Sequence, residues 1–436
     1  MITGYSPFRV AILAFFGIAG LASLFFIASY QSSQDDDRAR FGSRVVIWGT
    51  LDSAAVNRYL DEIKRTDRSF EVVTYRQLDS DTFDAELIEA LAERRGPDLL
   101  LLDAERLVKH RTRLAPFSYE SYTVRYIKDT YVDGAEVFAL STGLYALPFA
   151  VDPLVMFWNR DLFASNGFAV PPSTWETTVN ETVPVLTERT STRQIRRSAI
   201  AFGEYSNVNH AKKILLMLSL QSGSDMVRES GGRYSVNINT SATQGGNPLE
   251  TSLDFFTRFS NSNSEVYSWN NNLPTDRNAF SAGDLALYFA PGSEAVRIQE
   301  RNPNLNFDIE FAPQGASATL RRTQGNFYGF AVVRFSNNLQ GSFGVAGALS
   351  SPVNAPVLAR QLDMAPVHRW ALTDSSHNRF QQVLNQSALY SYSWLDPNPF
   401  RSDSIFRIMV EDITSGRSRT SPAASDATAR LQNLLR

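Results

Sequence analysis

Short apolar runs alternate with helical patterns in the first part of the chain. The runs at residues 44–49, 70–75 and 97–102 are almost continuously hydrophobic, whereas residues 54–66 and 82–95 carry apolar positions at helical spacing. Consecutive buried hydrophobic residues in strands that are joined by helices are typical of a parallel sheet. The sequence therefore predicts an α/β fold, in which a ligand crevice lies outside the carboxyl ends of the strands.

Polar side chains follow two of these predicted strands. Asp52 comes directly after the first strand, and Glu105 and Arg106 come after the third. Their position at the carboxyl ends of strands makes them candidate ligand-binding residues. Asp52 is equally well placed to cap the N-terminus of the following helix, since Asp is a preferred N-cap residue. Both roles remain open for Asp52.

A longer apolar stretch contains a single acid. It begins at Gly143, breaks at Pro148, leaves Asp152 as its acid and resumes at residues 156–163. This pattern predicts a strand that leaves one sheet and enters another, which makes Asp152 a hinge candidate. The following Pro-Pro-Ser-Thr-Trp at residues 171–175 marks a loop and then a helix N-terminus.

The order of these parts resembles the family 1 extracellular solute-binding proteins of bacterial ABC importers, including the maltodextrin-binding type. That family carries Tyr-Ala-Leu-Pro, an acid, an aromatic-Asn-basic-Asp-Leu unit and Pro-Pro-x-Thr-Trp, and residues 143–177 contain each part at a fitting distance. The resemblance implies a two-lobe, periplasmic-binding-protein-like (type II) α/β fold with a hinge. It also implies that the protein captures a solute between its lobes and delivers it to an ABC permease.

The resemblance assigns roles to several residues. Asp152 matches an acid that contacts sugar in maltodextrin-type relatives. Glu105 and Arg106 match an acid–arginine pair, and Tyr205 matches an aromatic residue that a loop presents to the ligand. Carboxylates suit the hydroxyl donors of a sugar, and aromatic rings suit its apolar faces. The expected ligand is therefore a small polar solute, most simply a carbohydrate.

Three further residues are candidate ligand contacts. Relatives carry sugar-stacking tryptophans at the positions of Leu102 and Ser293, so Ser293 would be either a small polar contact or a helix N-cap. Trp269 lies beside three asparagines, which resembles a carbohydrate contact but also fits a Trp that covers a helix end. Tyr328 lies in a strand that resembles a family segment near the cleft. The sequence thus predicts a cleft without the tryptophan platforms of the relatives.

The resemblance also implies domain boundaries. The expected parts are an N-terminal membrane segment at residues 1–30, a tether at 31–43, a first lobe at 44–151 plus 308–336, and a second lobe at 152–307 plus 337–436. The chain would cross between the lobes near Asp152, Phe307 and Ser336. A monomer is expected.

The N-terminal segment is apolar enough to cross a membrane. Residues 10–30 carry no charge, and about 21 residues at ~1.5 Å per residue span the ~30 Å hydrocarbon core of a bilayer. The alternative is a cleavable signal peptide, whose apolar region is shorter. The resemblance places the rest of the chain outside the cell membrane, either anchored by a single pass or secreted after cleavage.

Composition excludes several classes of function. The chain has no cysteine, which excludes disulfides, Cys-based zinc sites and a lipid-attachment cysteine. A net charge of -3 without a basic stripe disfavours nucleic acid. The four histidines show no metal-binding spacing, and neither a nucleophile elbow nor a phosphate-binding loop occurs. No cofactor or metal is expected, and a carrier is favoured over an enzyme.

Two alternatives to an importer component remain. Asp52, Glu105 and Asp152 could form the paired carboxylates of a glycoside hydrolase, although the sequence does not show their separation. A membrane-tethered protein of the same fold could instead sense a ligand or act as a scaffold. The N-terminal segment, which lacks a clear cleavage site, is compatible with that second alternative. So is the absence of the two tryptophans that relatives carry at the positions of Leu102 and Ser293.

Overall fold

The computed structural model describes residues 40–241, 246–373 and 378–435. The predicted membrane segment at residues 1–30 and most of the predicted tether lie outside these ranges. Among the residues that are described, no helix has the length and apolar composition needed to cross a membrane. The first described strand is β1 (Val45–Gly49).

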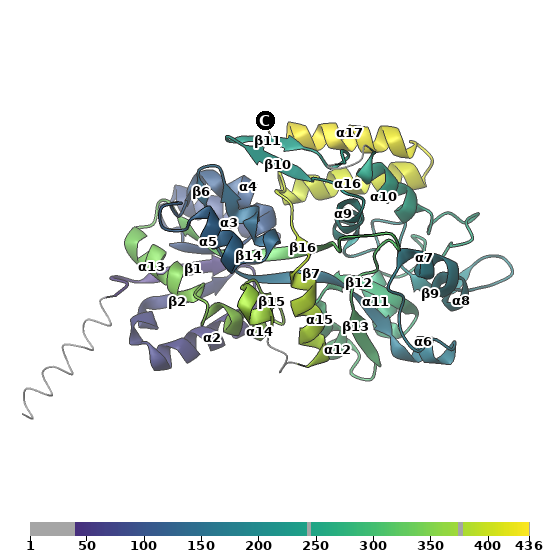
Figure 1. Cartoon of the computed structure of the whole chain (residues 1–436), viewed down its shortest axis with the longest axis horizontal. Coiled ribbons are helices and arrows are strands. Elements are labelled where there is room, and N and C mark those ends of the chain that lie inside the picture. The colour runs from purple at the N-terminus through teal and green to yellow at the C-terminus, as the bar shows by residue number, and fades with distance from the viewer. Residues whose placement is uncertain (1–39, 242–245, 374–377, 436) are drawn as a thin grey trace, which may run out of the picture.

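One mixed sheet runs through the molecule and joins two lobes (Figure 1), with the strand order β2-β1-β3-β14-β7-β12-β9-β8. Strands β2, β1 and β3 are mutually parallel, and so are β12 and β9, whereas β7 and β14 run antiparallel to their neighbours in this order. The predicted α/β fold of two lobes is confirmed. The other strands of this order are β2 (Val73–Gln77), β3 (Leu99–Asp103), β14 (Thr323–Val333), β7 (Leu147–Asn159), β12 (Leu285–Pro291), β9 (Ile195–Ile200) and β8 (Glu188–Arg189).

Strand β7 passes from one lobe into the other. Residues 147–153 pair with β14 in the first lobe, and residues 154–158 pair with β12 in the second. All 13 residues of β7 are buried, which explains why the strand is a nearly continuous apolar run. Asp152, the acid within this run, lies two residues before the change of partner. The prediction of one strand serving two lobes is confirmed.

The second connection between the lobes lies later than the sequence suggested. Strand β13 (Phe307–Glu310) still pairs with the second-lobe part of β7, at residues 156–159. The next strand, β14, pairs with β3 in the first lobe. The chain therefore crosses between Glu310 and Thr323, and not near Phe307. Phe307 belongs in the second lobe because its strand completes the sheet there.

The predicted crossing near Ser336 is wrong. Helices α13 (Leu339–Leu349) and α14 (Ala355–Gln361) pack on β14, β1 and α2 (Ser53–Thr66), all in the first lobe. Small residues make this packing close, since a Cβ on Gly341 would lie 2.2 Å from the Phe41 carbonyl oxygen. Helix α15 (Arg379–Ala388) next packs on β7, β15 and the second-lobe strand β13, and the chain then pairs once more with β14 through β16 (Ser391–Tyr392) before it enters the second lobe.

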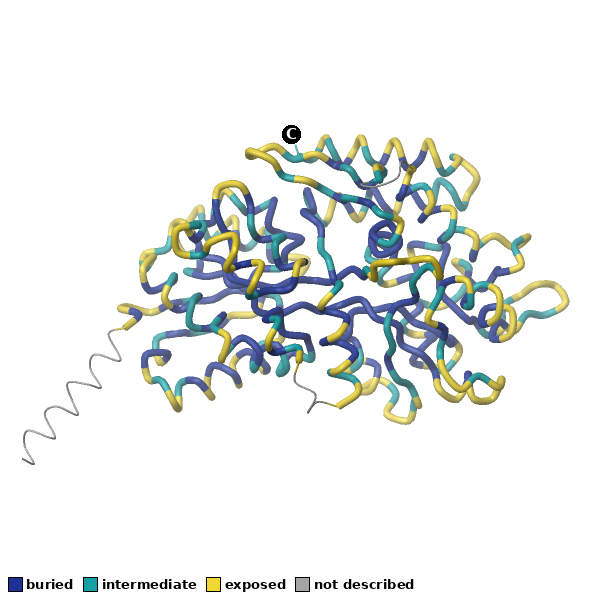
Figure 2. Tube along the Cα trace, in the orientation of Figure 1, coloured by how far each residue is buried: buried dark blue, intermediate teal, exposed yellow. Residues whose placement is uncertain are grey.

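Helices cover both faces of the sheet, with their buried sides turned inward and their exposed sides outward (Figure 2). The second lobe is closed by α9 (Ala211–Gln221), whose residues are buried almost throughout, and by α10, α16 and α17, which pack on one another. The remaining helices are α3 (Phe83–Ala92), α4 (Leu107–His110), α5 (Val124–Thr130), α6 (Arg160–Ser165), α7 (Trp175–Thr177), α8 (Val183–Leu186), α10 (Pro248–Thr257), α11 (Asp276–Ala282), α12 (Glu294–Arg301), α15 (Arg379–Ala388), α16 (Pro399–Thr414) and α17 (Thr420–Asn433). The remaining strands are β4 (Leu114–Ala115), β5 (Ala139–Leu140), β6 (Gly143–Leu144), β10 (Val227–Ser230), β11 (Arg233–Val236) and β15 (Ala365–Pro366).

Replacing Phe157 by alanine tests the second-lobe core around β7. The ring is fully buried and lies 5.7 Å from the ring centre of Tyr288, 6.0 Å from Phe307 and 6.3 Å from Phe280. We expect Phe157→Ala to lower the free energy of unfolding by about 3–5 kcal/mol, because it leaves a cavity. Urea unfolding measures this loss. The control Phe400→Ala, at a 72% exposed position, should change stability by less than about 0.5 kcal/mol.

Candidate functional site

The two lobes face each other across the carboxyl ends of four strands, β1 and β3 on one side and β9 and β12 on the other. Two hollows open there, with volumes of about 530 and about 220 Å³. Asp52 and Ser293 line the larger one, and Glu105 and Tyr205 line the smaller one. We call these two hollows the cleft. Four residues predicted from the sequence therefore lie, two in each hollow, in the region where the fold was expected to bind a ligand.

Asp152 links the two sides of the cleft. Its Oδ1 atom accepts a hydrogen bond of 3.1 Å from the Ser293 backbone N–H, and its Oδ2 atom accepts one of 2.6 Å from the Ser293 hydroxyl. Ser293 occupies the N-cap position of α12, yet its side chain makes no hydrogen bond to that helix. The hydroxyl is thus held by Asp152, so that this pair joins β7 to the start of α12.

Burial changes the acidity of Asp152. The side chain is only 2% exposed, and loss of hydration raises its pKa from 3.8 to about 6, while the hydrogen bonds from Ser293 and the charge of Lys213 oppose that rise. A buried carboxylate retains acceptor capacity that water would otherwise satisfy. Asp152 is therefore a desolvated acceptor in direct contact with Ser293, which lines the larger hollow.

Glu105 is held by two lysines from the opposite lobe. It lies in the turn after β3, where Asp103 accepts the Glu105 backbone N–H at 2.9 Å. Its Oε2 atom is 3.3 Å from Lys212 Nζ, and its Oε1 atom is 3.2 Å from Lys213 Nζ. These charges outweigh burial and lower the pKa of Glu105 to about 2. The first-lobe carboxylate is thus ionised and bound across the cleft.

Neither lysine was among the residues predicted from the sequence, because the rest of α9 is apolar. Lys212 Nζ also lies 2.9 Å from Asp396 Oδ2 and 3.4 Å from the Ser402 hydroxyl oxygen. Lys213 Nζ donates to Asn326 Oδ1 at 2.5 Å. A signal was present in the sequence, since two adjacent lysines at the start of an otherwise apolar helix require buried counter-charges.

Of the two predicted tyrosines, Tyr205 lines the smaller hollow, whereas Tyr328 is buried in β14 and lines neither hollow. Tyr328 stands opposite Asp103 in the β14–β3 ladder. Burial and the charges of Asp103, Asp152 and Glu105 raise the pKa of Tyr328 well above its usual value. Tyr205 donates its hydroxyl to Asp403 Oδ1 at 2.6 Å. The structure therefore brings Tyr205 and Tyr328 to the carboxylates with which the sequence grouped them.

Arg106 and Trp269 turn away from the cleft. The Arg106 guanidinium donates to the carbonyl and hydroxyl oxygens of Ser80, at 2.8 and 2.9 Å, inside the first lobe. Trp269 is 1% exposed, and its indole N–H donates to Asn207 Oδ1 at 3.0 Å. These contacts make both residues structural in this conformation.

Asp52 lies at the edge of the larger hollow and also caps a helix. Its Oδ1 atom accepts the Ala55 backbone N–H of α2 at 2.8 Å. The carboxylate remains exposed, so its second oxygen is open to a ligand in the hollow. Both roles that the sequence allowed for Asp52 are therefore compatible with its position.

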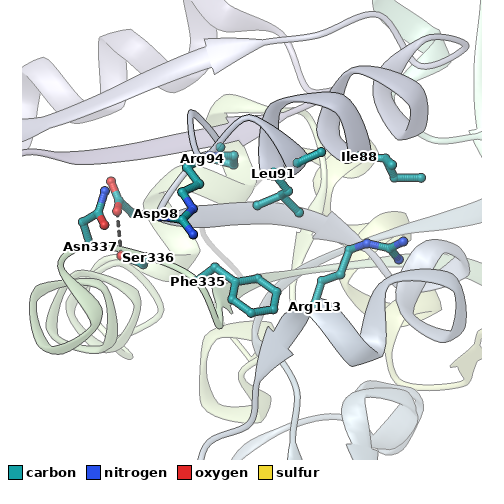
Figure 3. A pocket seen from close by; sticks show the side chains of 11 residues that line it. Ile88, Leu91, Arg94, Asp98, Arg113, Phe335, Ser336 and Asn337 are labelled. Atoms are coloured by element: carbon teal, nitrogen blue, oxygen red, sulfur yellow. Dashed lines mark hydrogen bonds between the residues drawn. The ribbon is translucent and has the colours of Figure 1, made fainter.

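A larger hollow, of about 710 Å³, lies at the other end of the first-lobe sheet (Figure 3). Its walls include Leu91 and Arg94 near the end of α3 and Phe335 after β14. Asp98 at its edge is already bound, since it accepts the Val46 backbone N–H at 2.8 Å and the Ser336 hydroxyl at 2.6 Å. This hollow contains none of the residues predicted to bind a ligand.

The cleft is equipped for binding more than for catalysis. Glu105 and Asp152 have oppositely shifted pKa values, as the acid and base of a glycosidase would, but each carboxylate has both oxygens in hydrogen bonds or ion pairs within the protein. In the described part of the chain, no three His, Asp or Glu side chains form a group that could hold a metal ion. The arrangement offers hydrogen-bond donors and acceptors to a polar ligand.

Comparison with known families identifies a relationship over most of the chain. The family described as bacterial extracellular solute-binding protein matches residues 57–351. This span is about two thirds of the 436 residues and includes Glu105, Asp152 and Ser293. None of the curated proteins compared with the chain matches it.

Solved structures of solute-binding proteins share the fold. A cyclo/maltodextrin-binding protein in complex with maltotetraose has a TM-score of 0.68 at 14% identity, over 89% of this chain and 96% of that one. The sugar-binding protein MalE from Xanthomonas citri has a TM-score of 0.68 at 16% identity, over 90% and 97%. An ABC transporter solute-binding protein from Thermotoga lettingae, bound with α-D-tagatose, has a TM-score of 0.67 at 16% identity, over 91% and 100%. The family resemblance predicted from residues 143–177 is confirmed.

We expect Asp152→Asn to remove a pH-dependent cost of folding. Because burial raises the pKa of Asp152 from 3.8 to about 6, the native state holds a proton that the unfolded chain has already lost. Wild-type stability should therefore fall as pH rises from about 4 to about 6, by up to about 3 kcal/mol from this group. Relative to wild type, the variant should gain that amount between about pH 4 and pH 7 in urea unfolding.

The matched control is Asp129→Asn, since the Asp129 side chain is 70% exposed. Its difference from wild type should stay constant over the same pH range. A constant difference for Asp152→Asn as well would contradict the raised pKa.

Glu105→Gln and Lys213→Met test the pairing across the cleft. Removing Glu105 takes the counter-charge from two lysines and should cost up to about 3–5 kcal/mol, whereas removing Lys213 leaves Glu105 with Lys212 and should cost less. We therefore expect each single variant to destabilise the protein and the double variant to cost about 1–3 kcal/mol less than the sum. Urea unfolding of the four proteins measures this coupling. The exposed Glu120→Gln should show no coupling to Lys213→Met, and an additive result for Glu105 would refute the contact.

Proposed function

The chain belongs to the bacterial extracellular solute-binding proteins, and we propose that it captures a carbohydrate between its lobes and delivers it to the permease of an ABC importer. Members of this family are carriers and not enzymes, and they work outside the cytoplasm. The observation that carries the proposal is that two hollows between the lobes are each lined from both sides, one by Asp52 and Ser293 and the other by Glu105 and Tyr205, and that Asp152 holds Ser293.

The chemistry of the cleft supports a sugar as the ligand. Carboxylate oxygens accept hydroxyl hydrogens, and lysine ammonium groups and serine hydroxyls donate to hydroxyl oxygens. Ser293 and Lys213 line the hollows and supply donors, Asp152 lies directly behind Ser293, and Tyr205 supplies a partly apolar side chain. Structures of the same fold have been solved with maltotetraose and with α-D-tagatose. A polyhydroxylated solute matches a cleft that offers donors and acceptors together.

Closure of the lobes would bring both halves of the site onto the sugar. Strand β7 and the segment between β13 and β14 connect the lobes. A few residues at the change of pairing partner, such as Asp152 to Leu154, can absorb the rotation of one lobe against the other. The present contacts of Glu105 with Lys212 and Lys213 already cross the cleft. The hydroxyl groups of an entering sugar would replace some of these contacts.

A ligand-sensing or scaffold role is the second candidate. It is favoured by the absence of a stacking platform, because Leu102 is fully buried and Ser293 is bound to Asp152. In this role the protein would close on its ligand without supplying a permease. The predicted membrane segment at residues 10–30 would hold the protein at the outer face of the cell membrane in either role, and this anchor stays a prediction.

Sugar binding by the full-length chain tests the proposal. We expect maltotriose, maltotetraose or tagatose to raise the melting temperature saturably, since a ligand at 100 times its dissociation constant adds about 2.7 kcal/mol of stability. Asp152→Ala should abolish the rise, because it removes the buried acceptor. Small-angle scattering should show a smaller radius of gyration with the bound sugar.

The control is Asp129→Ala, an exposed acid whose partner Arg125 is also exposed, and it should bind like wild type. If a broader panel of mono- and oligosaccharides, polyols and amino acids leaves the melting temperature unchanged, the carbohydrate assignment fails. A rise that survives in Asp152→Ala would place the binding site elsewhere.

A further inference from the structure

Three chain segments and Arg113 meet at the end of the first lobe that is remote from the cleft. The segments are residues 41–44 before β1, residues 93–98 before β3 and residues 334–338 after β14. The Asn338 amide donates to the Phe41 carbonyl oxygen at 2.8 Å, and the Arg334 backbone N–H donates to the Arg113 carbonyl oxygen at 2.8 Å. The last residue of β14 donates its backbone N–H to the Asp98 carbonyl oxygen at 3.0 Å. These bonds hold the segments together as one surface, which we call the basic end.

The basic end carries an excess of positive charge. It contains five arginines and two acidic residues, although the whole chain has a net charge of -3. Both acids are engaged within the protein, since Glu93 pairs with Arg95, and Asp98 accepts hydrogen bonds from a backbone N–H and a hydroxyl group. Arg94 and Arg334 are exposed and form no ion pair with another described residue. The charge of these two arginines is therefore available to an anionic partner.

Exposed apolar side chains lie beside these arginines. Phe335 is 67% exposed, and Leu339 and Ile88 are each 40% exposed. Phe335 and Ile88 line the hollow of about 710 Å³, and so do Arg94 and Arg113 (Figure 3). Apolar side chains that are exposed together commonly mark a surface that binds a protein or a membrane. The arginines beside them favour a partner with negative charge.

The place where the chain enters the first lobe favours a membrane as the partner. Nine residues, 31–39, separate the predicted membrane segment at residues 10–30 from the first described residue. Nine residues span at most about 32 Å when they are fully extended. Phe41 is bound by Asn338, which directly follows Asn337 in the wall of the hollow. With the segment at residues 10–30 in a bilayer, the basic end would lie within this short reach of the lipid headgroups.

We propose that the basic end docks on an anionic lipid bilayer. Arg94, Arg113 and Arg334 bind the phosphate groups of lipid headgroups, because a guanidinium group forms paired hydrogen bonds with phosphate. Phe335 enters the layer between the headgroups and the acyl chains, which aromatic side chains prefer. Leu339 adds apolar contact area there. This inference concerns a surface outside the cleft, and it does not rest on the proposed capture of a sugar.

A single fluorescent label tests docking in the full-length chain. The chain has no cysteine, so Asn337→Cys, at an exposed position beside Phe335, can be labelled with the environment-sensitive dye NBD. The labelled protein is reconstituted with vesicles of phosphatidylcholine alone or of phosphatidylcholine with phosphatidylglycerol. We expect brighter, blue-shifted emission with the anionic vesicles and not with the neutral ones. The same label at Val170→Cys, a 70% exposed position in the second lobe, should respond to neither.

Removing two arginines tests the charged contacts. Each arginine near an anionic surface should strengthen docking about fivefold, so Arg94→Gln/Arg334→Gln should reduce the ratio of docked to undocked protein about 25-fold. Arg94→Lys/Arg334→Lys retains the charges and should retain most of the docking. The matched control Arg258→Gln/Arg401→Gln removes two exposed positive charges from the second lobe and should dock like the parent protein. All three pairs carry the label at residue 337, and thermal unfolding checks that each is folded.

Other results overturn the proposal. Equal emission with neutral and anionic vesicles would show that the basic end does not dock. A response that persists in folded Arg94→Gln/Arg334→Gln would refute the arginine contacts, and an equal loss in Arg258→Gln/Arg401→Gln would make docking an effect of net charge alone. Phe335→Ser should weaken docking as well, and an unchanged response would refute insertion of the ring. Loss of sugar binding by the cleft would leave each of these measurements unchanged.

Discussion

The two hydrogen-bond ladders of β7 are the constraint on which the rest of the structure depends. One strand pairs with β14 in the first lobe and with β12 and β13 in the second, so the two lobes share one strand of a single sheet. Because all residues of β7 are buried, a polar side chain is stable in this strand only where it has a hydrogen-bond partner. Asp152 has that partner in Ser293. The same contact fixes the start of α12 and one wall of the cleft.

Charges in the cleft are balanced within the protein. Lys212 stands between Glu105 and Asp396, and Lys213 stands between Glu105 and Asn326. Each charge would be costly if it were buried alone, and the pairs are stable because every member has partners. The cleft therefore contains a set of exchangeable hydrogen bonds. A ligand binds well there only if it replaces the contacts that it breaks, which favours a solute with several hydroxyl groups.

The sequence predicted the lobes, the strand that they share and much of the cleft, because those features follow from local patterns. A buried strand appears in the sequence as an apolar run, and a single acid within that run indicates a position where the side chain has a specific polar partner, as for Asp152. Residues whose role depends on distant partners were harder to predict. Trp269 was grouped with ligand contacts by composition, but the fold supplies Asn207 as its acceptor. Lys212 and Lys213 lie in a mostly apolar helix, and their role was not predicted because their counter-charges come from elements far apart in the chain.

The placement of α13 has a mechanical consequence. Asn338, just before that helix, donates to the carbonyl oxygens of Phe41 and Ser43, at 2.8 and 3.0 Å. The start of β1 is thereby clamped at the end of the first lobe that is remote from the cleft. If the protein is attached through the residues that precede Phe41, the attachment therefore acts on the first lobe and not on the second. In the proposed closure, the second lobe would therefore move relative to both the first lobe and the point of attachment.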